Sequence, residues 1–131
     1  MRAMKNIHII ITLLLIFFTC SCSKNDEENN DLRSSLIGSW AEKPSREQFI
    51  FTFNKDGSGI HESLNSKYPE YTHYYPFTYK IDSKTMTLTI HFDDKPQDKL
   101  SLYKIKVTEN TLVMHLYEHG ELADTFYLFK Q

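Results

Sequence analysis

The chain has 131 residues, a formal net charge of −2, and charged residues of both signs that make up 24% of the sequence. This length suits one small domain, and no basic run is present, so nucleic acid is not an expected partner. Nine Phe and eight Tyr supply large side chains for a core.

The first 21 residues have the features of a secretory signal peptide. Arg2 and Lys5 precede an almost wholly apolar run at residues 7–18. This run is shorter than the about 20 residues that span a bilayer, and it matches the roughly 7–15 residues of a signal's hydrophobic region. We therefore expect residues 1–21 to be removed.

Two cysteines follow this run. Cys22 comes after the small residue Ser21, whereas Cys20 comes after the larger Thr19. The stretch resembles the lipobox of bacterial lipoproteins, which implies cleavage before Cys22 and its lipidation, and hence the membrane as a partner. The mature chain then has no free thiol, so disulfides, zinc–thiolate sites and cysteine nucleophiles are excluded.

Residues 22–30 are polar, with three acidic side chains and no apolar run, and we expect a disordered acidic tether there. Residues 24–28 (Lys-Asn-Asp-Glu-Glu) resemble the acidic export signal of surface lipoproteins in Bacteroidota. The resemblance implies a lipid-anchored outer-membrane protein exposed at the cell surface. A periplasm-facing location is the alternative.

The folded domain is expected at residues 31–131. Residues 31–38 predict a short helical lead-in that ends at Gly38, and the first strand should then end by Pro44. Residues 48–53 alternate strictly between aromatic and other side chains, which is typical of a half-buried strand. Gly57 predicts a tight turn into a strand at residues 58–64.

Residues 65–75 predict a long loop. The stretch holds four tyrosines, and Pro69 and Pro76 limit strand pairing. Further alternating segments at residues 77–81, 85–92, 99–107 and 111–117 predict strands. Residues 124–130 predict a last strand that is too apolar on both faces for its inward side to be assigned. The pattern of residues 99–107 changes phase, which indicates a bulge near Leu102.

About eight short strands joined by tight turns predict an all-β fold, an antiparallel up-and-down meander. Closing such a meander removes its exposed edges, and eight strands make a small barrel. Its interior is expected to be lined by Phe49, Phe51, Phe53, Tyr79, Met86, Leu88, Ile90, Met114 and Leu116.

Residues 36–40, 51–59, 79–81, 103–105 and 126–130 together resemble the lipocalin-like domains of bacterial lipoproteins. The resemblance implies structural roles for Gly38 and Trp40, with the tryptophan closing the barrel floor. Lipocalins often place an arginine from a late strand over this tryptophan. Here Lys130 is the only cation near that position.

No catalytic or metal-binding pattern is present. The histidines lack ligand spacing and are expected at the surface or the barrel rim. The sequence has no Gly-x-Ser-x-Gly elbow. We therefore expect no enzyme activity, no cofactor and no metal site.

Two functional hypotheses follow from the sequence. In the first, the barrel binds a small apolar or amphiphilic ligand, unless its side chains fill it completely. In the second, the barrel is filled, and a loop bearing Tyr68, Tyr71, Tyr74 and Tyr75 recognises a glycan or an envelope protein. A loop that folds over the barrel mouth is the alternative to recognition.

Overall fold

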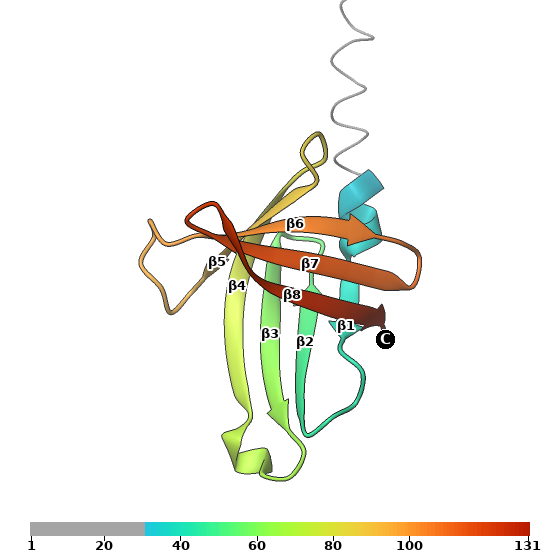
Figure 1. The fold of residues 1–131 in the computed structure, drawn as a ribbon, viewed down its shortest axis with the longest axis vertical. Coiled ribbons are helices and arrows are strands. Elements are labelled where there is room, and N and C mark those ends of the chain that lie inside the picture. Colours follow the sequence, from blue (N-terminus) through green and yellow to red (C-terminus); the bar gives the residue numbers. More distant parts are fainter. Residues whose placement is uncertain (1–30) are drawn as a thin grey trace, which may run out of the picture.

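The computed structural model describes residues 31–131, so the predicted signal peptide, Cys22 and the tether lie outside the described residues. Eight antiparallel strands follow one another around a closed barrel (Figure 1). They are β1 Gly38–Ala41, β2 Glu47–Phe53, β3 Ser58–Asn65, β4 His73–Asp82, β5 Thr87–Phe92, β6 Ser101–Val107, β7 Thr111–Glu118 and β8 Glu121–Lys130. The predicted all-β meander barrel is confirmed.

Helical structure is short. Residues 31–36 are helical, and a 3-10 helix, η1, spans Pro69–Tyr71 between β3 and β4. The two lie at opposite ends of the molecule, with residues 31–36 at the closed end and η1 at the tip of the long β3–β4 hairpin (Figure 1). Within residues 31–131 no helix is long and apolar enough to cross a membrane.

The strand alternation places one set of side chains inside the barrel. Phe51 and Phe53 are each 1% exposed, and Thr52 between them faces outward. The same alternation runs through the other strands, because successive side chains of a strand point to opposite faces. The fully buried core comprises Leu36, Trp40, Phe51, Phe53, Phe77, Leu88, Ile90, Leu112, Met114 and Leu128.

The β4–β5 turn corrects one predicted lining residue. Met86 shares the sequence phase of Leu88 and Ile90, which are both fully buried. However, β5 begins only at Thr87, and Met86 lies in the turn with a left-handed backbone (φ 51°). That conformation leaves its side chain 38% exposed, outside the barrel lining.

The predicted loop at residues 65–75 is also corrected. β4 begins at His73, so Tyr74, Tyr75 and even Pro76 belong to a strand. The carbonyl of Pro76 accepts a hydrogen bond from Asp93, just beyond the end of β5. The N–H and C=O of one strand residue point to the same neighbouring strand, so a backbone N–H at position 76 would also point toward β5. Proline lacks this N–H, and it is tolerated here because the β4–β5 pairing ends at this residue.

The predicted bulge near Leu102 is wrong. β6 alternates regularly, with Tyr103 and Ile105 buried and Leu102 41% exposed on the outer face. The irregularity lies in β8 instead. Leu116 pairs with Asp124 and Tyr117 with Leu122, so Ala123 is an extra residue.

Gly59 allows close packing inside the barrel. It pairs with Phe53 on one side and Phe77 on the other, and both rings face inward. A Cβ atom at Gly59 would lie 2.4 Å from the Phe77 ring and 2.5 Å from the Thr52 carbonyl oxygen. Only glycine fits without displacing this ring or the β2 backbone.

We therefore expect Gly59→Ala to destabilise the barrel. Overpacking a dense core costs about 1–3 kcal/mol, and each kcal/mol lowers the melting temperature of a domain this size by about 4–8 °C. Thermal unfolding followed by circular dichroism measures the effect, with Ser63→Ala on the same strand as the control. An unchanged melting temperature for Gly59→Ala would contradict the contact.

Candidate functional site

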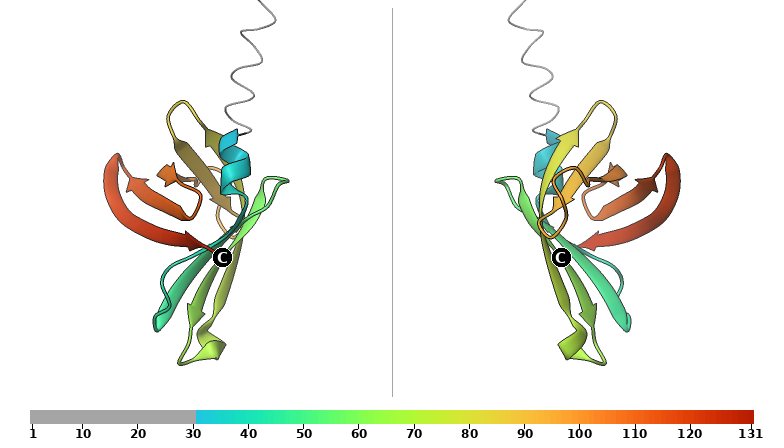
Figure 2. Two further views of the ribbon diagram at one scale, coloured as in Figure 1. Left: turned by 90° about the vertical axis from the view of Figure 1, so that its right-hand side faces the viewer. Right: turned by 90° about the vertical axis from the view of Figure 1, so that its left-hand side faces the viewer.

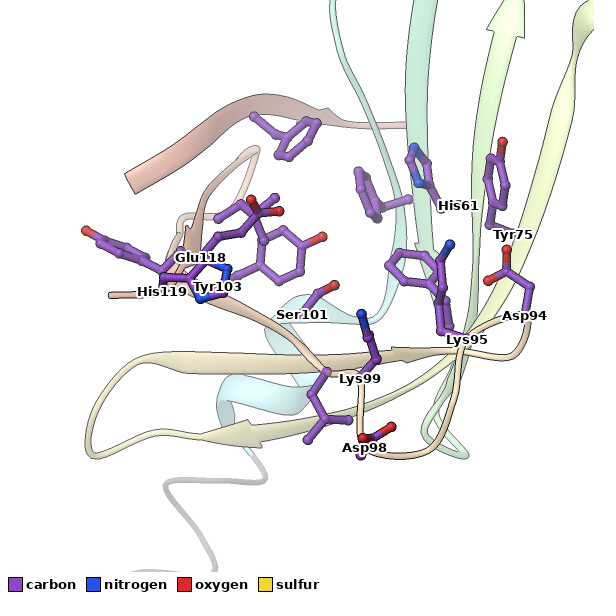
Figure 3. A pocket seen from close by; sticks show the side chains of 16 residues that line it. His61, Tyr75, Asp94, Lys95, Asp98, Lys99, Ser101, Tyr103, Glu118 and His119 are labelled. Atoms are coloured by element: carbon purple, nitrogen blue, oxygen red, sulfur yellow. The ribbon is translucent and has the colours of Figure 1, made fainter. Parts of the chain in front are cut away.

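A cavity of about 730 Å³ opens among strands β2–β8, at the end of the barrel opposite residues 31–36. Its inner wall is largely aromatic and includes Phe51, His61, Tyr75, Phe92, Tyr103 and Phe126. Its mouth carries charged and polar side chains from the β5–β6 loop and the β7–β8 turn: Asp94, Lys95, Asp98, Lys99, Glu118 and His119 (Figure 3). The site is thus apolar inside and charged outside.

Two groups of strands supply the walls. The arms of β2, β3 and β4 lie on one side of the molecule and the curved β7–β8 hairpin on the other (Figure 2). Phe126 of β8 meets Phe51 of β2 edge-on at 5.6 Å between ring centroids, and it meets Phe49 at 5.8 Å. These contacts join the two walls at the bottom of the cavity.

His61 is the polar member of this aromatic wall. Its β-sheet partners are Phe51 and Tyr75, and all three share the inward face. Its ring stacks on Phe51 at 4.2 Å with an interplanar angle of 11° and meets Phe49 edge-on at 5.3 Å. Among the described residues, its covered Nε2 has no hydrogen-bond partner.

Burial lowers the pKa of His61 from 6.5 to about 4. The cause is desolvation, since the wall around the ring is apolar and a charged imidazolium loses its hydration there. At neutral pH the ring is therefore uncharged, with one nitrogen as a donor and the other as an acceptor.

Tyr103 contributes a second polar group to the cavity. Burial is the main cause that raises the pKa of its phenol to about 12; a hydrogen bond with Ser101 opposes this shift, and the charges of Asp124 and Glu118 add to it. The hydroxyl therefore stays protonated at neutral pH. It faces the cavity near the charged mouth (Figure 3).

The structure divides the predicted lining residues into three groups. Phe51 and Leu116 line the cavity, and Phe49 packs beside it. Five others lie in the filled closed half of the barrel: Phe53, Tyr79, Leu88, Ile90 and Met114. Met86 lies outside. The interior is thus filled at one end and hollow at the other.

The four predicted recognition tyrosines are also divided. Tyr75 lines the cavity. Tyr68, Tyr71 and Tyr74 are 37%, 60% and 59% exposed near η1 and the start of β4. Lys67 lies 5.3 Å from the centre of the Tyr68 ring.

The expectation of surface or rim histidines missed His61. The sequence contained the information needed to place it. The three alternating phenylalanines of β2 mark the inward face, and the tight turn at Gly57 fixes which residues of β3 pair with them. That pairing puts Gly59, His61 and Ser63 on the inward face. Which other residues form the wall and the mouth of the cavity depends on pairing between distant strands, and no short sequence pattern indicates it.

The closed end is sealed around Trp40, which is fully buried. Its Nε1 donates a 2.8 Å hydrogen bond to the carbonyl of Leu36. The Lys130 ammonium lies 5.3 Å from the centre of its ring. A lysine of the last strand thus occupies the place over this tryptophan that lipocalins often give to arginine.

No group of three or more His, Cys, Asp or Glu side chains that could hold a metal ion occurs within residues 31–131. His115 Nδ1 instead lies 2.9 Å from the Thr125 hydroxyl on the outer face of β7. His91 Nε2 lies 3.2 Å from the carbonyls of both Lys95 and Pro96, in the loop that borders the cavity.

The model of the lipocalin-like domain family matches residues 20–114, more than half of the chain. The protein therefore belongs to the lipocalin-like domain family, in agreement with its closed eight-stranded barrel. This barrel type indicates ligand binding in general. A search of curated proteins found no match.

The half-buried His61 predicts a specific loss of stability in acid. Its pKa is about 4 in the folded protein and 6.5 as the reference for the unfolded chain. Between these values the unfolded chain binds more protons, so stability is full above pH 6.5 and falls as the pH drops toward 4. At pH 4.5 the free energy of unfolding should have lost about 2–3 kcal/mol from this group.

Urea unfolding at pH 7.5 and pH 4.5 measures this effect. His61→Phe keeps a ring of similar size but has no proton to bind, so its free energy of unfolding should fall less over the same interval. Both proteins have the same carboxylates, so subtracting the loss of unfolding free energy in His61→Phe from the loss in the wild type leaves the contribution of His61. Equal losses in both would show that the imidazole is not held neutral by burial.

Proposed function

We propose that this protein is a lipid-anchored lipoprotein of the bacterial cell envelope whose barrel binds a small apolar or amphiphilic ligand. One observation carries the proposal: the half-filled barrel contains a cavity of about 730 Å³ with an aromatic wall. Ligand sites in proteins are typically concave, mostly apolar and about 300–1,000 Å³ in volume. The cavity has the size and the character of such a site.

The distribution of polarity favours an amphiphile. Apolar atoms of a ligand would gain about 25 cal/mol for each Å² that they bury against the aromatic wall. A polar group would stay hydrated at the mouth, where Lys95, Lys99 and Glu118 lie. A ligand with one apolar part and one polar part uses both regions.

Asp31, where the proposed tether would join the barrel, lies at the end opposite this mouth (Figure 1). Cys22 and Asp31 are 31 − 22 = 9 residues apart, which limits the tether to about 30 Å. The helical segment 31–36 packs on the closed end, with Leu36 buried beside Trp40. An anchored barrel would therefore hold its cavity away from the bilayer, and ligand would enter from the aqueous side.

We further propose an outer-membrane location with the barrel at the cell surface, and binding rather than catalysis as its activity. The acidic residues after Cys22 support the surface location. The cavity wall supports binding, because its side chains are mainly apolar rings and its imidazole stacks on Phe51.

A second candidate function is recognition of a glycan or an envelope protein by the hairpin tip. Tyr71 and Tyr74 are both more than half exposed, and Tyr68 lies between the cations Arg46 and Lys67. Exposed tyrosines offer a rigid apolar face and a polar end, which suits such partners. Tyr75 does not belong to this surface, because it lines the cavity.

Native mass spectrometry tests the binding function. Protein purified gently from its native host should carry a reproducible extra mass that is lost on unfolding. Leu116→Trp places a larger side chain in the cavity and should reduce the bound fraction about tenfold or more. Leu122→Trp is the control, because Leu122 is 57% exposed on the outside. A bare mass for the wild type, with no uptake of apolar probes, would overturn the proposal.

Metabolic labelling with a radioactive fatty acid tests the anchor. The wild-type protein should incorporate label and sediment with membranes, because several acyl chains anchor a protein durably. Cys22→Ser should lose both properties, whereas Cys20→Ser should keep them. Label retained by Cys22→Ser would exclude Cys22 as the lipidated residue.

A further inference from the structure

The inner part of the cavity is shaped by ring faces and edges from both walls. Phe51 and His61 form a stacked pair on one side, with Phe92 6.2 Å from His61. Phe126 and Tyr103 lie on the other side, 6.4 Å apart. Aromatic pairs in offset or edge-on geometry gain free energy beyond the area that they bury. Such walls complement a flat ring better than a flexible chain.

The His61 imidazole adds a hydrogen-bonding requirement. Its Nε2 is covered and unpartnered, and a buried polar atom without a partner costs about 1–3 kcal/mol. A half-turn of the ring about χ2 exchanges the positions of its nitrogens and carbons and preserves the stack on Phe51. Because His61 lines the cavity, such a turn changes which ring atoms meet a ligand while the ring keeps its place on Phe51.

The charges at the mouth do not select an anion. Three carboxylates (Asp94, Asp98 and Glu118) and two ammonium groups (Lys95 and Lys99) line the mouth, and these five groups sum to 2 − 3 = −1. A carboxylate, sulfonate or phosphate head group would meet net negative charge there. A neutral molecule meets neither this repulsion nor the cost of desolvating its own charge.

We infer that the ligand is a neutral, planar aromatic or conjugated molecule with a hydrogen-bonding group on its edge, which binds between the two walls with that group directed to His61. This inference rests on the proposed binding function and specifies its ligand class: the hydrogen-bonding group lies against His61 inside the cavity and not among the charges of the mouth. Saturated acyl chains are the competing class. They would fill the same volume but would lose the freedom of many rotatable bonds.

Equilibrium dialysis with four probes tests the inference. The probes are 2-naphthol, naphthalene, 1-decanol and 2-naphthalenesulfonate, and the first three have the same number of carbons. Hydrophobicity alone makes 2-naphthol the weakest of these three: naphthalene has no hydroxyl to remove from water, and the saturated chain of decanol has more apolar surface to bury. We expect the reverse: 2-naphthol should bind about three- to tenfold more tightly than naphthalene, the range of one net hydrogen bond. Decanol and the sulfonate should bind more weakly than 2-naphthol.

The full chain and two variants complete the experiment. His61→Phe should retain naphthalene binding within about twofold, which also shows that the barrel is folded, and should lose the preference for 2-naphthol. His115→Phe is the matched control, since His115 lies on the outer face of β7. Residues 1–30 are common to all three proteins, so probe binding there cancels in the comparison. If His61→Phe does not fold, His61→Leu serves the same purpose.

Two results would overturn the ligand class while leaving the binding function intact. Tightest binding of decanol would identify a chain ligand. A 2-naphthol preference that survives in His61→Phe would place the hydrogen bond elsewhere. If none of the four probes binds, both the ligand class and the proposed binding function fail.

Discussion

The barrel depends on a short seam between its first and last strands. β1 and β8 pair only at Trp40 with Lys130 and at Ala41 with Phe129. Because so few backbone groups pair between β1 and β8, side-chain contacts must help to keep the barrel closed. Trp40 supplies them by bonding to Leu36, by filling the floor and by lying under the Lys130 ammonium. Without this seam β1 and β8 would each keep one paired neighbour and would become the exposed edges of an open sheet.

A closed floor lets the two halves of the barrel differ. Near Trp40 the interior is packed with large side chains, and Gly59 makes room for the Phe77 ring. Farther along the same strands, beyond the contact between Phe51 and Phe126, the walls separate and the cavity opens. The packed half supplies the stability, so the open half can keep a hollow and a neutral buried imidazole, both of which cost free energy.

Local patterns predicted the strands, and long-range pairing decided the site. The alternation that ends in Phe51 and Phe53 identified β2 and its inward face, because a period of two is a property of any strand. Met86 failed because a left-handed turn interrupted the same alternation. Tyr75 was assigned to a loop because Pro76 follows it. Pro76 is nevertheless part of β4, because the β4–β5 pairing toward which its backbone points ends at that residue. No local pattern shows which loops meet at the cavity mouth.

The extra residue in β8 has a consequence for how this family can diverge. Ala123 lies between the partners of Leu116 and Tyr117, at the end of β8 nearest the cavity mouth. A one-residue insertion in a period-two strand reverses the faces of everything on one side of it. Here the reversed part is only the tip of the hairpin, while Phe126 and Leu128 keep their inward positions. Insertions and deletions at this point can change the entrance over evolutionary time without reorganising the core.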